Sequence, residues 1–440
     1  MPIILENEEM PRYLRVYQYY KELIINGQIQ AETKLPSIRK ASTQLQVSRT
    51  TMESAYMLLA AEGYIISKPQ SGYYVTDMGA KQNEEQLPRL QKLEMKDEIR
   101  YDFLTSNVDR ESFKFELWRR YMKSALRQDE RLFSYGEPQG EYDFREVLCA
   151  YLQKERSVVC TPDQIVIGAG VQSLLNILCP ILKERKKIAF YNPKFAQGRA
   201  IFEDYGYKIG SDSTLVKDGI FYVSPSQLTK WGGVLNITER RNLLKEAQKK
   251  NCLIIEDDYS SEYRYFQKPT PSLQGLAGGH GVIYLGTFSK MLLPSIRMSF
   301  MVLPPEILPA YKSRMGMYNQ TASKAEQIAI TQFIRDGHLS SQIRKSRKIH
   351  LAKATELANV VEKILGNKGK ATIGETGFHV YVSLETEMTA KEFAERAKGK
   401  GVLVLPEETS EGEIAKIMLN CANVAVEDYE AAVEILKECL

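Results

Sequence analysis

A polar stretch near the N-terminus divides the 440-residue chain into two unlike parts. Residues 77–98, DMGAKQNEEQLPRLQKLEMKDE, are rich in charged and polar residues, contain one Pro and show no sustained apolar period. This composition is typical of a surface linker. Because the chain is also too long for one compact core, we predict a first domain over residues 1–76, a linker over residues 77–98 and a larger domain over residues 99–440.

The overall composition excludes several classes of protein. Hydrophobic residues make up 43% and charged residues 26% of the chain, values that exclude a disordered, collagen-like or coiled-coil protein. The apolar runs are too short to cross a membrane, and the N-terminus lacks the pattern of a secretory signal, so we expect a soluble, cytoplasmic protein. The six cysteines and four histidines show no metal-ligand spacing, so we expect reduced thiols and no metal site.

The first domain shows three helical patterns followed by a pair of strands. Apolar residues recur at helical spacing over residues 12–26, and a second helix is expected to start at Pro36. Ser48 is a good N-cap for a third helix. One stripe of this third helix is apolar and is expected to be buried: Met52, Ala55, Tyr56 and Leu59. Two short strands, joined by a tight turn at Gly72, complete the plan of a winged helix-turn-helix.

The third helix exposes residues that suit DNA. Arg49, Thr50 and Thr51 lie together at its N-terminal turn, where helix-turn-helix proteins contact DNA. Arg can bridge a guanine edge, and hydroxyls and free helix N–H groups hold phosphates. The net charge of the chain is only +4, but residues 33–76 carry five Lys or Arg against two Glu. The alternative interpretation is a small helical bundle in which Arg49 and Thr50 are solvated caps.

The same segment resembles the GntR family of bacterial regulators, which carries LPS-x-R, V-S-R-x-T and G-x-x-V motifs. The matching residues are Leu35-Pro36-Ser37 with Arg39, Val47-Ser48-Arg49 with Thr50 and Thr51, and Gly72 with Val75. The resemblance implies a set of DNA-binding residues: Ser37, Arg39, Ser48, Arg49, Thr50, Thr51 and Gly72. Glu53 stands where many relatives carry a base, which indicates a different operator preference or one weaker phosphate contact.

The larger domain alternates strand-like runs with helical patterns, which predicts an α/β fold with a mostly parallel sheet. A buried strand delivers Asp257 and Tyr259 at its C-terminal end, and Lys290 follows the next strand. Ligands of open α/β sheets bind at this edge. Pyridoxal phosphate needs an amine for a Schiff base, a carboxylate for its ring nitrogen, a phenol or amide for its ring hydroxyl and a phosphate cradle. Each residue alone is weak evidence, because a lone Lys after a strand is usually a surface charge.

The order of these motifs resembles the fold type I aminotransferases over roughly residues 100–440. The resemblance implies that Lys290 forms the Schiff base to pyridoxal phosphate, that Asp257 pairs with the pyridine nitrogen and that Tyr259 hydrogen-bonds the ring oxygen. It also implies that Phe195 stacks on the cofactor, although ordinary core packing is the alternative. The residues that it implies around the phosphate are Gly170, Val171, Thr287, Ser289 and Arg297.

A GntR-like domain joined to an aminotransferase-like domain is the architecture of MocR-type transcriptional regulators, and the chain is identified as a member of this group. The resemblance implies a homodimer, head-to-tail, in which pyridoxal phosphate or its adduct with an amino compound biases the placement of the DNA-binding domains. We therefore expect a regulator that binds promoter DNA and is not an enzyme, with residual transaldimination or half-transamination left open. The alternatives are a working aminotransferase with an accessory DNA-binding domain and a winged-helix protein with a cofactor-free dimerisation scaffold.

Two departures from amino-acid-binding relatives concern the ligand. Gln197 and Met418 stand where those relatives carry Arg residues that hold a ligand carboxylate. Neither side chain can form that bidentate pair, so we do not expect an ordinary amino acid held in the usual way. The aminotransferase alternative would need another Arg, such as Arg344 or Arg347.

Four further features of the larger domain have smaller implications. The loop at residues 225–233 departs from the family pattern, which weakens the case for a second hydrogen bond to the ring hydroxyl from this loop. His379 has two open interpretations, a residue facing the ligand pocket and an ordinary core histidine. Glu256 and Asp258 are expected to be structural.

Overall fold

The structure, a computed structural model, describes residues 10–69, 71–76, 99–105, 109, 111–192, 195–211, 213–229, 231–263, 270–374, 379–407 and 414–440. The chain divides into two compact units, Met1–Met95 and Lys96–Leu440, and each is described by itself. The predicted linker, residues 77–98, lies outside the described residues.

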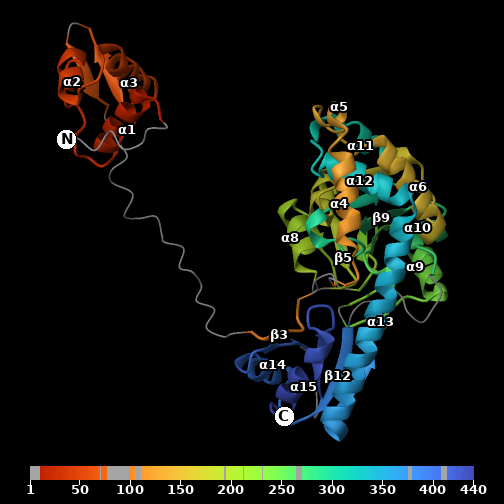
Figure 1. Cartoon of the computed structure of the whole chain (residues 1–440). Coiled ribbons are helices and arrows are strands. Elements are labelled where there is room, and N and C mark those ends of the chain that lie inside the picture. The colour runs from red at the N-terminus through yellow and green to blue at the C-terminus, as the bar shows by residue number, and fades with distance from the viewer. Residues whose placement is uncertain are drawn as a thin grey trace. The chain divides into compact units, whose positions relative to one another are not determined.

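The N-terminal unit is a winged helix-turn-helix, which confirms the predicted fold (Figure 1). Its elements are α1 (Arg12–Ile25), α2 (Ile38–Leu45), α3 (Arg49–Ala61), β1 (Ile65–Lys68) and β2 (Gly72–Val75). The two strands pair antiparallel. The predicted apolar stripe of α3 is buried, and it packs against apolar residues of α1 and both strands. Ser48 caps α3, because its hydroxyl accepts a hydrogen bond from the N–H of Thr51 at 3.1 Å.

Two predicted boundaries in this unit differ from the structure. The second helix starts at Ile38 rather than at Pro36, because Ser37 is its N-cap and accepts a hydrogen bond from the N–H of Lys40. Gly72 begins β2 and pairs with Lys68, so it ends the hairpin turn and does not stand at its centre. Gly72 has φ +112°, a conformation that favours glycine.

The larger unit is built on a seven-stranded sheet with the order β4-β10-β9-β8-β7-β5-β6. The strands are β4 (Ile165–Gly168), β5 (Lys187–Phe190), β6 (Lys208–Ile209), β7 (Ile220–Val223), β8 (Leu253–Asp258), β9 (Val282–Thr287) and β10 (Ser299–Val302). β10 runs antiparallel to both neighbours, and the pairs from β9 to β6 are parallel. The predicted α/β fold with a mostly parallel sheet is therefore confirmed.

Helices cover both faces of this sheet (Figure 1). The helices of this lobe are α4 (Phe115–Ala125), α5 (Asp129–Leu132), α6 (Tyr142–Arg156), α7 (Val171–Ile181), α8 (Ala196–Asp204), α9 (Ile237–Lys249), α10 (Leu273–Leu276), α11 (Leu308–Lys312) and α12 (Lys324–Arg335). Alternate residues of each strand point to opposite faces. On β8, Leu253 and Ile255 pack with α7 and α8, whereas Ile254 packs with α9. By this alternation Asp257 faces the α7 and α8 side of the sheet.

The C-terminal part forms a smaller lobe around a four-stranded antiparallel sheet. Its elements are α13 (His338–Leu365), β11 (Gly369–Ile373), β12 (His379–Glu385), α14 (Ala390–Gly399), β13 (Val402–Leu403), β14 (Leu405–Pro406), β15 (Ile414–Asn420) and α15 (Tyr429–Lys437). The long helix α13 runs from the large lobe along the smaller one (Figure 1). β3 (Tyr101–Asp102) pairs with β13 and so places residue 104 beside this lobe.

Three general features limit other interpretations. Within the described ranges, the helices are too short or too polar to cross a membrane. The described His, Cys, Asp and Glu side chains do not cluster in groups of three or more that could hold a metal ion. All six cysteines are buried as free thiols.

Candidate functional site

A cavity of about 500 Å³ lies at the carboxyl ends of the central strands. Of the predicted cofactor-binding residues, five line it: Val171, Phe195, Asp257, Tyr259 and Lys290. The other four lie at the N-terminal end of α7 and on the neighbouring strand ends: Gly170, Thr287, Ser289 and Arg297. The smaller lobe contributes Leu405, Met418 and His379 to the cavity wall. The strand-end placement follows from the parallel sheet, whose ligand sites form at this edge.

Asp257 lies in the cavity wall with one of its oxygens unsatisfied. Its Oδ2 accepts a hydrogen bond of 2.7 Å from Tyr222 Oη, but its buried Oδ1 has no hydrogen-bond partner among the described residues. Burial raises the pKa of Asp257 to about 6, against the lowering effects of Tyr222 and Lys290. A buried acceptor without a donor is costly. A protonated ring nitrogen is a donor that would satisfy this oxygen, so Asp257 fits its predicted partner.

Lys290 is held close to Asp257 and Tyr259. Its Nζ lies 4.5 Å from the centroid of the Tyr259 ring, and Tyr263 Oη donates a hydrogen bond of 2.7 Å to the Lys290 carbonyl oxygen. Burial lowers the pKa of Lys290 to about 8, although Asp257 opposes this shift. A Lys with a lowered pKa is a better nucleophile at neutral pH, because more of it is the free amine. Lys290 can therefore attack a carbonyl carbon.

The N-terminal end of α7 is suited to an anion. Gly170 is its N-cap with φ +89°, and none of the described side chains caps the helix start. A Cβ added to Gly170 would lie 2.7 Å from Arg297 Nη2, so only glycine lets the guanidinium approach the backbone this closely. Free helix N–H groups beginning at Val171, together with a guanidinium, are the groups that bind phosphate.

Thr287 and Ser289 lie beside this helix end. Ser299 pairs with both Gly168 and Thr287 across the sheet, which places the glycine turn and the end of β9 on either side of one residue. The Thr287 hydroxyl accepts hydrogen bonds from the Ser289 N–H at 3.2 Å and from Ser299 Oγ at 3.0 Å. These hydrogen bonds fix the Thr287 hydroxyl at the end of β9.

The Phe195 side chain packs in the core and also lines the cavity. Its ring centroid lies 5.1 Å from that of Tyr222 at an interplanar angle of 32°, and the ring packs against Gly198, where a Cβ would clash with it. The ring also lines the cavity. Core packing and a face open to a ligand are therefore compatible, and both interpretations of Phe195 stand.

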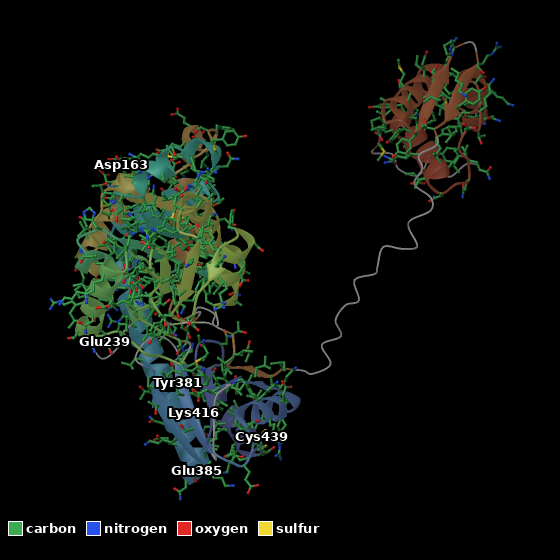
Figure 2. All side chains as sticks on the ribbon, turned by 180° about the vertical axis from the view of Figure 1, so that it is seen from behind. Asp163, Glu239, Tyr381, Glu385, Lys416 and Cys439 are labelled. Carbon is green, nitrogen blue, oxygen red and sulfur yellow. The ribbon has the colours of Figure 1, made fainter. Side chains whose placement is uncertain are left out.

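Two residues that depart from the family pattern lie in the cavity wall. Gln197 and Met418 both line the cavity, as does His379 at the start of β12. Figure 2 shows Tyr381 at the end of this strand nearer the large lobe and Glu385 at its far end. Neither Arg344 nor Arg347 is among the described lining residues.

Several lining residues are not among the predicted site residues, and Tyr222 and Gln227 are two of them. Tyr222 orients Asp257, but it belongs to β7, and only the strand register brings it to its partner. Gln227 is buried and lines the cavity, and its Oε1 has no hydrogen-bond partner within the described ranges. The Thr229 hydroxyl of the same loop is engaged in its turn, where it contacts the Gly232 carbonyl oxygen.

The neighbouring acids are engaged away from the cavity. Asp258 Oδ2 accepts hydrogen bonds of 2.7 Å from Arg156 Nε and from Tyr284 Oη. Glu256 accepts two hydrogen bonds from backbone N–H groups at the start of α10. Both side chains therefore tie the sheet to its helices.

Most of the predicted DNA-binding residues are exposed on the N-terminal unit. The exposed members are Ser37, Arg39, Ser48, Arg49, Thr50 and Gly72, and Thr51 is half-buried. Arg49 and Thr50 occupy the first turn of α3, while Arg39 occupies the first turn of α2. A helix start that presents Arg and hydroxyl groups can enter a groove and contact phosphates.

The wing carries a basic cluster, Lys34 and Lys68 around Tyr74, that was not predicted from the sequence. Lys34 Nζ lies 5.8 Å and Lys68 Nζ 4.6 Å from the centroid of the Tyr74 ring. The Tyr74 hydroxyl and Ser71 Oγ are 2.7 Å apart, and this bond together with both Lys residues lowers the pKa of Tyr74. The sequence alone does not bring Lys34 to Tyr74, because the contact depends on how the hairpin folds back on Lys34.

Comparisons with known proteins agree with both units. The sequence model described as "Bacterial regulatory proteins, gntR family" matches residues 12–75. The model described as "Aminotransferase class I and II" matches residues 101–211 and 216–436. The HTH-type transcriptional regulator YdeL of Bacillus subtilis is 34% identical over 99% of this chain and 98% of its own length. The probable rhizopine catabolism regulatory protein MocR of Rhizobium meliloti is 26% identical over 92% of this chain and 88% of its own length.

A solved structure supports the fold of the larger unit. The kynurenine aminotransferase of Pyrococcus horikoshii superposes with a TM-score of 0.66 and 22% identity, covering 78% of this chain and 91% of that one. Fold and site thus define a transcriptional regulator with a winged helix-turn-helix and a domain of the pyridoxal phosphate-dependent aminotransferase type. The chain belongs to the MocR-type regulators of the GntR family.

Proposed function

We propose that this regulator binds promoter DNA in the cytoplasm through α3 and the wing, and that pyridoxal phosphate in the cavity of the larger unit changes that binding. The observation that carries the proposal is the unsatisfied Oδ1 of Asp257 in a cavity that also holds Lys290. Lys290 would hold the cofactor aldehyde, Asp257 its ring nitrogen and Tyr259 its ring oxygen. Gly170, Val171, Thr287, Ser289 and Arg297 would hold its phosphate.

The cofactor and the protein have separate parts in this proposal. Pyridoxal phosphate, when bound, supplies an aldehyde that bonds to amines and a ring that withdraws electrons. The chain supplies an amine of lowered pKa at Lys290, an acceptor at Asp257 and an anion site at the start of α7. Burial of Asp257 keeps water from competing for its free oxygen.

We also propose that two chains form a homodimer, in head-to-tail arrangement. Phe133 and Tyr135, in the stretch after α5 (Asp129–Leu132), are almost wholly exposed, and Tyr142 at the start of α6 is half exposed. Exposed apolar side chains gathered in one stretch mark interaction surfaces. A second copy is the occupant expected here, because a dimer gives two DNA-binding units for the two half-sites of an operator.

The cofactor assignment is tested by absorption spectroscopy of the full-length protein. Adding pyridoxal phosphate to the wild type is expected to give a visible band of protein-bound cofactor, and Lys290→Ala is expected to abolish it. Lys154→Ala, which removes an exposed Lys of α6, is the matched control and is expected to keep the band. A band that survives in Lys290→Ala would contradict the assignment.

The regulatory part is tested by gel shift with the DNA upstream of the protein's own gene. Adding pyridoxal phosphate is expected to change the affinity of the wild type and to leave that of Lys290→Ala unchanged. Equal affinity of the wild type with and without the cofactor would contradict a sensing role while leaving the spectroscopic result intact.

A further inference from the structure

Few of the described side chains that line the cavity are charged, which limits the kind of second ligand that can bind there. Apart from His379, the only acidic or basic side chains among its described lining residues are Lys290 and Asp257. Asp257 is taken by the ring nitrogen of the proposed cofactor, and Lys290 either holds the cofactor aldehyde or, once the ligand displaces it, is a neutral amine. No described Arg or further Lys lines the remaining space. A carboxylate brought into this space would lose its hydration without gaining a cation from the described lining residues, which is unfavourable.

The wall contributed by the smaller lobe is apolar. Met418 on β15 is 4% exposed and pairs with Leu405 of β14 across the sheet. Leu104, which follows β3, lines the cavity beside them. Three apolar side chains from three segments thus form one surface, and such a surface favours a hydrocarbon body.

Apart from His379, the remaining polar side chains among the described lining residues are uncharged amides and hydroxyls. Gln197 is exposed in the first turn of α8 (Ala196–Asp204), at the cavity wall. Gln227 is 3% exposed, and its Oε1 lacks a hydrogen-bond partner among the described residues. An amide oxygen accepts a hydrogen bond from a neutral donor but cannot neutralise a carboxylate.

We infer that the ligand that joins pyridoxal phosphate in this cavity is a primary amine with an uncharged, largely apolar body and no carboxylate. The inference rests on the proposed function, because it counts Lys290 and Asp257 as occupied. The exchange balances without an oxidant. The carbon–nitrogen double bond to Lys290 breaks as one to the ligand nitrogen forms, and the two protons of the ligand amine pass to Lys290, which leaves as a neutral amine.

The test compares three probes that share one apolar chain: 3-methylbutylamine, leucinamide and leucine. Full-length protein loaded with pyridoxal phosphate is titrated with each, and the change in visible absorption gives a dissociation constant, corrected for the fraction of neutral amine. We expect 3-methylbutylamine and leucinamide to bind at least tenfold more tightly than leucine, because only leucine carries a carboxylate. Equal or tighter binding of leucine would overturn the inference.

Two variants reverse the expected order. Gln197→Arg adds a guanidinium at an exposed position and is expected to tighten leucine binding at least tenfold, while Gln197→Met is expected to leave the order unchanged. Met418→Arg places a guanidinium at a buried position and is also expected to tighten leucine binding. Unchanged leucine binding in cofactor-loaded Gln197→Arg would count against the inference. Failure of the wild type to take up the cofactor would instead reject the proposed function, so the two failures are distinguishable.

Discussion

Asp257 and Asp258 are neighbouring carboxylates on β8 that differ in what stabilises their charge. Burial disfavours the ionisation of both, but Arg156 and Tyr284 outweigh it at Asp258 and lower its pKa. Asp257 receives one hydrogen bond, from Tyr222, and its pKa rises to about 6. A cationic ligand group would therefore stabilise the ionised form of Asp257, whereas Asp258 already has its cation.

Replacing Tyr222 by Phe is expected to weaken pyridoxal phosphate binding. Because the Tyr222 hydrogen bond lowers the pKa of Asp257, its loss raises that pKa further above 6. Below its pKa the carboxyl is neutral and cannot hold a protonated ring nitrogen, so the loss is greater at pH 6 than at pH 8. We expect about tenfold weaker affinity at pH 7, a size typical of one hydrogen bond to a charged group. Absorption titrations with the cofactor from pH 6 to pH 8 measure the cofactor affinity at each pH.

The matched control is Tyr284→Phe. It removes a hydrogen bond of the same length to Asp258, on the other face of the sheet. The cofactor affinity of this variant is expected to equal that of the wild type. A Tyr222→Phe variant whose affinity loss did not depend on pH would show that Tyr222 acts by packing rather than through Asp257.

At the scale of single elements, the start of α7 depends on one glycine. In Gly170→Ala the new Cβ would meet Arg297 Nη2 and would also carry the strain of a positive φ. We expect at least tenfold weaker binding of pyridoxal phosphate, because the guanidinium must leave the helix start. Gly206→Ala is the control, since it has φ +76° with nothing within 4 Å of the added Cβ. If both variants bound the cofactor equally, the Arg297 contact would not matter for binding.

Helix α3 is the element expected to read DNA bases. Arg49→Ala removes an exposed guanidinium from its first turn and is expected to weaken operator binding by about 1–3 kcal/mol if it contacts a base edge. Arg241→Ala, at an exposed position of α9 in the other unit, removes the same charge and should leave the affinity unchanged. Gel shifts at one fixed salt concentration measure both variants. Equal affinities of Arg49→Ala and the wild type would place the recognition surface elsewhere.

The sequence predicted elements better than contacts between them. Helical spacing identified α1 and α3, and strand runs bounded by motifs identified β8 and β9, because these signals are local. The pairing of Tyr222 with Asp257 could not be predicted in this way, since it depends on the register of β7 and β8. The wing cluster around Tyr74 was missed for the same reason, because Lys34 reaches it only after the hairpin folds back.

At the scale of the whole molecule, the proposed cofactor cavity and the helix-turn-helix lie in separate compact units. The described residues that line the cavity all belong to the larger unit. In the proposed dimer, a signal from the cavity would reach the DNA through the way in which the larger units hold the two N-terminal units. The proposal therefore makes the association of two chains a condition for regulation.

A variant that replaces the exposed aromatic side chains after α5 is therefore expected to fold but to lose dimerisation and tight operator binding. Phe133 and Tyr135 are 92% and 103% exposed, so Phe133→Glu with Tyr135→Asp should leave the single chain folded. If these side chains lie in the dimer interface, burying two carboxylates there is unfavourable. We expect sedimentation to give the 50.2-kDa chain mass for this variant and twice that for the wild type. Ile237→Glu, at the exposed start of α9, is the control and should remain dimeric.

The monomeric variant should keep its cofactor band yet bind the operator at least tenfold more weakly, because each half-site is then bound alone. A double variant that remained dimeric with full operator affinity would exclude this stretch from the interface.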